Sequence, residues 1–137
     1  MRKRSYAVYD VFADRPLAGN PLAVVFDADD LDAEAMQRIA GEFNLSETTF
    51  VSRAESPRHR ANVRIFTPRR ELPFAGHPTV GTAIALTEND YGGADIFVLE
   101  ERVGAVRCAV SRANGVAFAE FDLPRLPERL GFSATRE

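Results

Sequence analysis

Cysteine, histidine and long apolar runs are all scarce in this chain of 137 residues. The single cysteine, Cys108, excludes an internal disulfide and supplies no metal-ligand cluster. The two histidines, His59 and His77, lack the spacing of a zinc site, so we expect no metal. No segment approaches the length of a transmembrane helix, and the apolar residues after the basic start are soon broken by Asp10 and Asp14, unlike those of a signal peptide. We therefore expect a cytoplasmic protein with no membrane partner.

Positive charge is too dispersed to form a surface for nucleic acid. The formal net charge is -3, and lysine and arginine are scattered without the basic stripe that nucleic-acid binding requires. Hydrophobic residues make up 45% of the chain and charged residues 27%, which is the balance of an ordinary globular domain with a real core. We find no internal repeat and no low-complexity segment. We therefore expect one globular domain with no nucleic-acid partner.

Hydrophobic periodicity predicts a domain of both helices and strands. An amphipathic helix is expected over Ala33 to Phe43, with Asp32 as its N-cap. A second helix is expected from Pro78 to about Glu88, and Ala113-Asn114-Gly115 is typical of a hairpin turn. Strands are expected over Tyr6 to Phe12, Leu22 to Phe26, Ser46 to Val51, Arg60 to Phe66, Asp95 to Glu100, Gly104 to Ser111 and Val116 to Phe121.

The stretch from Phe74 to Ala83 places a histidine at the start of the second helix. Pro78 suits the first helical position, so we expect His77 at or next to the N-cap. The backbone donors of Thr79 to Gly81 would then lack partners and form an anion site. From Val80 to Leu86 the helix is apolar or small on every side, which predicts a helix wrapped by other elements. The alternative is that His77 only caps the helix and that the nearby glycines only pack.

Together these elements predict an α+β fold. We expect a strongly curved, mixed sheet wrapped around the central helix that starts at Pro78, with the helix from Ala33 to Phe43 outside it. Cys108 shares a strand face with Val106 and Val110. We therefore interpret Cys108 as a small buried hydrophobic residue and not as a nucleophile.

Several short motifs follow one another in order along the chain. They are Gly19-Asn20-Pro21-Leu22-Ala23-Val24-Val25, Asn44-Leu45-Ser46-Glu47-Thr48, Arg64-Ile65-Phe66-Thr67-Pro68, Glu71-Leu72, Phe74 and Gly76-His77-Pro78-Thr79-Val80-Gly81. Each motif is weak by itself, but the ordered set closely resembles the N-terminal half of the phenazine biosynthesis PhzF-like family, whose members are relatives of diaminopimelate epimerase. The resemblance covers the chain up to about Leu126.

This resemblance implies a lobe of the diaminopimelate-epimerase fold and an isomerase that needs no cofactor and no metal. Such an enzyme moves a proton next to a carbon that bears an amine or a carboxylate in a small molecule. In the epimerase relatives a cysteine does this work, whereas the matching place here holds Glu47. The resemblance therefore implies Glu47 as the general acid/base and His77 as the helix-mouth histidine. The small-molecule carboxylate substrate would be bound at Asn20, Ser46, Gly76, Thr79, Val80 and Gly81.

The chemistry of these residues agrees with that implication. Removing a proton from carbon requires a base tuned toward neutral pH, and a carboxyl group desolvated among Leu45, Phe50 and Phe74 meets this need. Negative charge on the substrate would be met by the backbone donors of the helix mouth. From the residues alone two alternatives stay open: Glu47 as a surface strand glutamate, and Asn20 as a residue that caps its own turn.

The chain departs from the family in its length. Family members have two similar lobes and are about twice as long, and their site lies between the lobes, with an aspartate and another glycine-rich helix mouth from the second lobe. We interpret residues 1–126 as a single N-terminal lobe and residues 127–137 as a tail or a truncated linker. A single lobe would expose apolar surface, so we expect a homodimer or a separate second lobe as partner.

Two functions of different class follow. The first is a PhzF-like isomerase that shifts a proton on, or epimerises, a small amino or hydroxy carboxylic acid through Glu47 and His77 and is incomplete without a second lobe. The alternative is a non-catalytic single lobe that binds a small anion or a protein partner.

Overall fold

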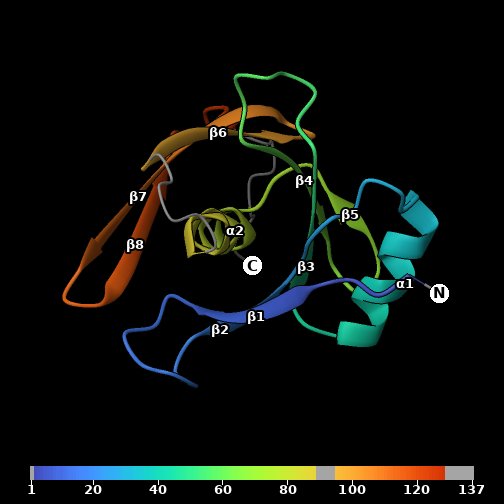
Figure 1. Cartoon of the computed structure of the whole chain (residues 1–137), viewed down its shortest axis with the longest axis horizontal. Coiled ribbons are helices and arrows are strands. Elements are labelled where there is room, and N and C mark those ends of the chain that lie inside the picture. The colour runs from blue at the N-terminus through green and yellow to red at the C-terminus, as the bar shows by residue number, and fades with distance from the viewer. Residues whose placement is uncertain (1, 89–94, 129–137) are drawn as a thin grey trace, which may run out of the picture.

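A mixed sheet of eight strands curls around one helix, and a second helix lies outside the curl (Figure 1). The computed structural model describes residues 2–88 and 95–128. Its elements are β1 (Tyr6–Val11), β2 (Asn20–Val25), α1 (Ala33–Phe43), β3 (Glu47–Ser52), β4 (Ala61–Phe66), β5 (Glu71–Leu72), α2 (Gly76–Glu88), β6 (Ile96–Glu101), β7 (Gly104–Ala113) and β8 (Val116–Phe121). The strand order is β1-β2-β3-β4-β6-β7-β8, with the short β5 paired to β4.

Two parallel strand pairs decide the topology. β2 pairs with β3 and β4 pairs with β6 in parallel, whereas the other neighbouring pairs of this sheet are antiparallel. A parallel pair needs a crossover connection, and here α1 and α2 supply one each. α1 lies outside the curl and α2 inside it (Figure 1). The predicted α+β fold, a curved mixed sheet around a central helix, is confirmed.

The central helix α2 is enclosed by the sheet. Thr79, Thr82, Ala83 and Ala85 are buried, and the helix packs against β1, β2, β3, β7 and β8. A buried hydrogen bond between the hydroxyls of Thr49 and Thr82, 2.8 Å long, ties α2 to β3. A helix without a polar face is stable only where other elements cover it. The prediction of a wrapped helix is therefore confirmed.

The outer helix α1 covers the other face of the sheet with its apolar side. Met36 and Ala40 pack against Phe50 of β3. The helix starts at its predicted N-cap, because Asp32 Oδ1 accepts a hydrogen bond of 2.8 Å from the N–H of Ala35. Both ends of α1 fall where the sequence predicted them.

The start of α2 differs from the prediction. The helix begins at Gly76 and not at Pro78, because the carbonyl of Ala75 accepts hydrogen bonds from the N–H of Thr79 at 3.2 Å and from its hydroxyl at 2.7 Å. Pro78 lies within the first turn, where its missing N–H costs nothing. The N–H of Thr79 is therefore already paired, and the donors left unused by the helix are those of Gly76 and His77.

The strands match the predictions to within about two residues, with one omission. β5, Glu71–Leu72, was not predicted because two residues show no alternation; it pairs with Ile65 and Phe66. The β7–β8 hairpin turns at Asn114 and Gly115, whose φ values of 53° and 77° are both left-handed. That conformation is the one favoured by an Asn-Gly pair, as the sequence predicted.

Some predictions concern residues outside the described ranges. Residues 129–137 belong to the predicted tail, so a domain boundary at residue 126 stays a prediction. Within residues 2–88 and 95–128, no helix combines the length and the apolar character needed to span a membrane.

Gly81→Ala is expected to destabilise the domain, because α2 has no room for a side chain at this point. A Cβ atom on residue 81 would lie 2.5 Å from Leu22 Cδ2 and 2.7 Å from Val11 Cγ2, and both neighbours are buried. Overpacking of this kind costs about 1–3 kcal/mol. Thermal unfolding followed by circular dichroism should show a lower Tm for the variant.

Gly41→Ala on the outer helix is the matched control. A Cβ atom there would meet only the carbonyl of Pro68, at 3.8 Å, which is an ordinary contact. Alanine is favoured over glycine inside a helix by roughly 0.5–1 kcal/mol. The control should therefore keep or raise the Tm, and an equal loss of Tm in both variants would contradict the overpacking argument.

Candidate active site

Glu47 and His77 are in direct contact at the point where α2 meets β3. Nδ1 of His77, the second residue of α2, lies 2.7 Å from Oε2 of Glu47, the first residue of β3. The side chains are mostly buried, with 11% of His77 and 18% of Glu47 exposed. The structure thus brings the two predicted catalytic residues together and leaves each a small accessible edge.

The contact made by Nε2 of His77 shows that this nitrogen carries a hydrogen. Nε2 lies 3.0 Å from the backbone carbonyl oxygen of Asn20. A carbonyl only accepts hydrogen bonds, so Nε2 must carry a hydrogen. The short contact to Glu47 then also needs one hydrogen, which resides either on Nδ1 or on the carboxyl group. The pair therefore holds one proton between a nitrogen and an oxygen, the arrangement expected of a proton-transfer site.

Strand alternation aims Glu47 at the central helix. Glu47 and Thr49 lie on the same face of β3, and both contact α2, through His77 and Thr82 respectively. Glu47 and Thr49 are two residues apart, about 7 Å along a strand, and His77 and Thr82 are five residues apart, about 7.5 Å along a helix. The strand and the helix therefore present their partners at the same spacing. Phe50 lies on the opposite face, against α1. The prediction that Phe50 desolvates Glu47 is therefore wrong.

A carboxylate that the sequence did not single out holds Asn20 in place. Asp10 accepts hydrogen bonds from the backbone N–H groups of Ala18 at 2.9 Å and Gly19 at 3.1 Å. Gly19 has no room for a side chain, because a Cβ atom would lie 2.3 Å from the carbonyl oxygen of Val11. The connection between β1 and β2 is thereby closed tightly, and the carbonyl of Asn20 faces the His77 ring.

Phe12 covers His77 from the side of the β1–β2 connection. The two ring centroids are 5.9 Å apart and the planes are inclined by 42°. Phe12 has a left-handed φ of 60°, which is rare for a bulky residue, and 72% of it is exposed. Strained, exposed residues of this kind are concentrated at functional sites. No signal in the local sequence indicates this conformation.

Gly76 lies next to His77 and packs against the ring of Phe121. A Cβ atom on Gly76 would lie 3.3 Å from Cζ of that ring. Phe121 in turn makes an edge contact with Phe74, with centroids 5.3 Å apart. The absence of a side chain at Gly76 thus lets β8 approach the helix mouth, beside the unused N–H groups of Gly76 and His77.

The other predicted substrate-binding residues do not cluster around the Glu47–His77 pair. Ser46 is exposed just before β3. Thr79 is fully buried, and Gly81 is packed against Leu22. Val80 is half-buried and lines a groove on the neighbouring face of α2. An anion site built from the N–H groups of Thr79 to Gly81 does not fit this geometry, because an α-helix that begins at Gly76 uses these groups for its own bonds.

Glu101 is a buried carboxyl group near the helix mouth that belongs to none of the motifs in the sequence. It is 7% exposed, and its Oε1 lies 2.8 Å from the hydroxyl of Thr79. Burial raises the pKa of Glu101 to about 7. The alternation of β6 could have revealed it, because Phe97, Leu99 and Glu101 share the face that points into the core.

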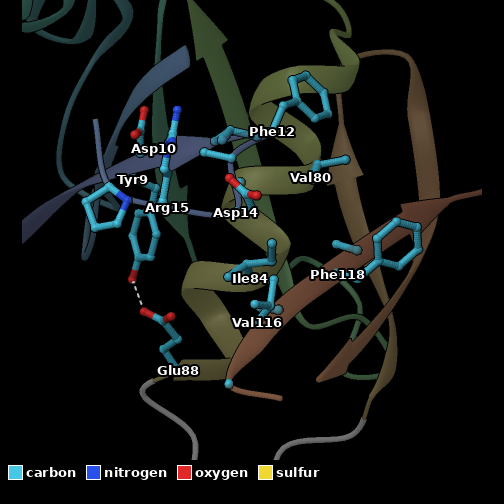
Figure 2. Close-up of a pocket in the computed structure, with 17 residues that line it drawn as sticks. Tyr9, Asp10, Phe12, Asp14, Arg15, Val80, Ile84, Glu88, Val116 and Phe118 are labelled. Atoms are coloured by element: carbon cyan, nitrogen blue, oxygen red, sulfur yellow. Dashed lines mark hydrogen bonds between the residues drawn. The ribbon is translucent and has the colours of Figure 1, made fainter. Parts of the chain in front are cut away.

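A groove of about 770 Å³ lies between β1, α2 and β8, beside the pair and without either member of it. In Figure 2, Phe12 and Val80 lie at one end of the groove, and Tyr9 and Glu88 lie at the other. The Tyr9 hydroxyl donates to Glu88 at 2.8 Å, and burial together with this bond raises the pKa of Tyr9 above its usual range. Phe12 therefore has one side against His77 and also lines this largely apolar groove.

The second histidine and the cysteine have structural roles. His59 lies 2.8 Å from Glu100, which also accepts the N–H groups of Glu55 and Ser56, so this pair anchors a loop. Among residues 2–88 and 95–128, no group of histidine, cysteine and carboxylate side chains is suited to hold a metal ion. Cys108 is 1% exposed, as predicted, and burial raises the pKa of its thiol to about 12.

Comparison of sequences identifies relatives over nearly the whole chain. A family model described as phenazine biosynthesis-like protein matches residues 9–134. An uncharacterized isomerase from Mesorhizobium japonicum is 62% identical over 98% of this chain and 45% of its own length. A trans-2,3-dihydro-3-hydroxyanthranilate isomerase from Pseudomonas aeruginosa is 55% identical over 83% of this chain and 40% of its own length. The chain thus spans less than half the length of these relatives.

Solved structures share the fold. A protein described as a predicted epimerase from Pseudomonas aeruginosa has a TM-score of 0.79 at 41% identity, covering 88% of this chain and 43% of its own. A PhzF family protein from Bacillus anthracis has a TM-score of 0.78 at 35% identity, covering 88% and 40%. A hydroxyproline epimerase from Agrobacterium vitis, at 15% identity, has a TM-score of 0.57 over 79% of this chain and 38% of its own, a likeness of fold alone. The predicted diaminopimelate-epimerase-like fold is confirmed.

Cys108 is expected to resist thiol reagents while the protein is folded. Its burial and its raised pKa leave almost no accessible thiolate at mildly alkaline pH. The rate of modification by a chromogenic disulfide reagent should therefore follow the rate of unfolding as denaturant is added. Cys108→Ala provides the blank, since the chain has no other cysteine. Rapid, stoichiometric modification without denaturant would contradict the buried position.

Proposed function

The chain belongs to the phenazine biosynthesis-like protein family, and we propose that it carries the acid/base half of a cofactor-independent isomerase. The proposed reaction moves a proton on a small amino or hydroxy carboxylic acid. The observation that carries the proposal is the 2.7 Å contact between Glu47 and His77, which holds one proton at the mouth of a buried helix.

Glu47 is the proposed base. Its Oε2 is held by His77, while its Oε1 makes no hydrogen bond to the described part of the chain. With the shared proton on His77, Glu47 is a carboxylate, and Oε1 is available to take a proton from substrate carbon. The C–H bond then breaks, its electron pair stays on the substrate, and the same carboxyl group returns the proton to that carbon or to a conjugated one.

The start of α2 is the proposed stabiliser of the charge that develops on the substrate. The N–H groups of Gly76 and His77 are not used within the helix, and the positive end of the helix dipole lies at the same place. Donors fixed in this way stabilise a developing anion without reorganising. Base and anion donors would then act from neighbouring residues on one small surface.

The proposed substrate class comes from the name of a relative. The Pseudomonas aeruginosa protein that is 55% identical is named for trans-2,3-dihydro-3-hydroxyanthranilate, a compound with amino, hydroxyl and carboxylate groups. A substrate of this class has an acidic C–H bond and an anionic group for the free donors. We propose a small molecule of the same class for this chain.

The proposed site needs a second half. This chain covers only 45% and 40% of the length of the Mesorhizobium japonicum and Pseudomonas aeruginosa isomerases, and the Glu47–His77 pair lies at a partly open edge. Exposed apolar side chains flank the groove, including Phe12 and Phe118. A second copy of the chain or a separate lobe would cover this surface and complete the cleft, and we propose the homodimer for the chain by itself.

The alternative proposal is a non-catalytic lobe that binds a small anion or a protein partner. The same unused N–H groups at the start of α2 favour it. This alternative differs from the first in requiring no proton transfer to carbon, so an exchange measurement separates the two.

Glu47→Gln is expected to slow the exchange of the substrate C–H proton with solvent strongly, because an amide cannot act as the base. Exchange would be measured by NMR in deuterium oxide with trans-2,3-dihydro-3-hydroxyanthranilate, using the chain alone and the chain combined with a second lobe from a relative. A fall of roughly 100-fold or more is expected, and His77→Asn should slow exchange as well.

The exposed Glu120→Gln serves as the control for loss of one carboxylate, because Glu120 lies on β8, away from the pair. It should leave exchange unchanged. An exchange rate that Glu47→Gln leaves unchanged would eliminate the assigned base, and absence of exchange in every preparation would favour the non-catalytic lobe.

Sedimentation of the chain at micromolar concentration is expected to show a dimer that depends on the groove. Phe118→Ser should shift the dimer toward monomer, because this exposed ring belongs to the apolar surface between β1 and β8. Leu17→Ser removes an apolar side chain that is even more exposed but lies outside the groove, so it should leave the dimer intact. A monodisperse monomer of the unchanged chain would refute the dimer.

A further inference from the structure

Glu101 has an unusual hydrogen-bond environment for a carboxyl group. It is the last residue of β6, and 93% of it is buried, since only 7% is exposed. Oε1 lies 2.8 Å from the hydroxyl oxygen of Thr79. Oε2 is fully buried and has no hydrogen-bond partner within residues 2–88 and 95–128. A carboxylate left with a bare buried oxygen is costly, whereas a neutral acid tolerates this far better.

The number of hydrogens available around Thr79 also favours the neutral, protonated form of Glu101. The Thr79 hydroxyl oxygen is 2.7 Å from the carbonyl of Ala75 and 2.8 Å from Glu101 Oε1. The hydroxyl has one hydrogen, and the carbonyl has none to offer. If that hydrogen goes to Ala75, the second short contact requires a hydrogen on Glu101. Both contacts are hydrogen bonds only when Glu101 is a neutral acid that donates to Thr79.

Among residues 2–88 and 95–128, no charged side chain holds Glu101 in its ionised form. Arg102, next in the chain, donates to Glu71 at 2.9 Å. From β7 the neighbouring titratable group is the buried thiol of Cys108, and from α2 the neighbour is the uncharged Thr79. Desolvation therefore dominates, and it raises the pKa of Glu101 to about 7.

These bonds lie directly beneath the candidate site. Ala75 and Thr79 close the first turn of α2, and the residues between them include Gly76 and His77. We propose that Glu101 is a positioning residue for the Glu47–His77 pair: as a neutral acid it donates to Thr79 and thereby fixes the turn that presents His77. This inference rests on the proposed function, because only a proton-transfer site gives the position of His77 its significance.

Ionisation of Glu101 would loosen that turn. Without its hydrogen, the carboxylate competes with the Ala75 carbonyl for the single hydroxyl hydrogen of Thr79. Because the folded pKa lies above the usual glutamate value of about 4.3, this carboxyl also makes folding less favourable as pH rises from there through about 7. The ordered form of the site is therefore the form below about pH 7.

The test follows Glu101 and His77 by NMR in the full 137-residue chain, across neutral pH. With carboxyl-labelled glutamate, the Glu101 signal should titrate near pH 7, and the ring signals of His77 should show a step at the same pH. Glu101→Gln keeps a donor for Thr79 and should remove the step while leaving His77 as it is at low pH. Glu101→Met has no donor and should shift or broaden the His77 signals at every pH.

Glu120→Gln, on the exposed surface of β8, is the matched control and should keep the step. If Glu101→Met fails to fold, the comparison of Glu101→Gln with the unchanged chain still decides the matter. Ionisation of Glu101 near the usual glutamate value, or a His77 step that survives Glu101→Gln, would overturn the proposal. These readouts need no substrate, so they stand or fall separately from the isomerase activity.

Discussion

The enclosure of α2 by a curved sheet is the constraint on which the rest of this domain depends. The fully buried positions of this helix carry small side chains, and its buried polar groups must find partners inside the protein. Gly81 lies against Leu22 and Val11, and Thr82 is paired with Thr49. The same enclosure brings Glu47 of β3 against His77. The candidate site is therefore an extension of the core packing and not a separate feature on the surface.

The curl of the sheet does not close. β1 and β8 are the two ends of the strand order and do not pair with each other, and the groove over α2 lies between them. Unpaired strand edges with apolar side chains are normally covered in stable proteins. Phe12 connects this groove to the candidate site, because its ring contacts both the groove and His77. A second chain or lobe that covers the groove would therefore contact Phe12 and, through its ring, affect the position of His77.

The sequence predicted the elements whose signals are local and missed those that depend on distant contacts. α1 was predicted to the residue because Asp32 and the apolar spacing lie within the helix itself. The start of α2 was misplaced because a proline fits any position of the first helical turn, so Pro78 by itself does not mark the first residue. The PhzF-like motifs indicated Glu47 and His77, and strand alternation would have turned Phe50 away from them. Glu101 followed the alternation but was passed over, because a charged residue type is seldom expected in a core.

The carbonyl of Asn20 has a consequence for how this site can vary. The group that keeps a hydrogen on Nε2 of His77 belongs to the main chain, so replacing the side chain of residue 20 does not remove it. Its position is set by the length of the connection between β1 and β2 and by the clamp of Asp10 on Ala18 and Gly19. The length of this loop therefore decides which ring nitrogen of His77 carries a hydrogen. An insertion or deletion in the loop would alter the acid/base behaviour of the site, although every side chain that contacts the ring would stay the same.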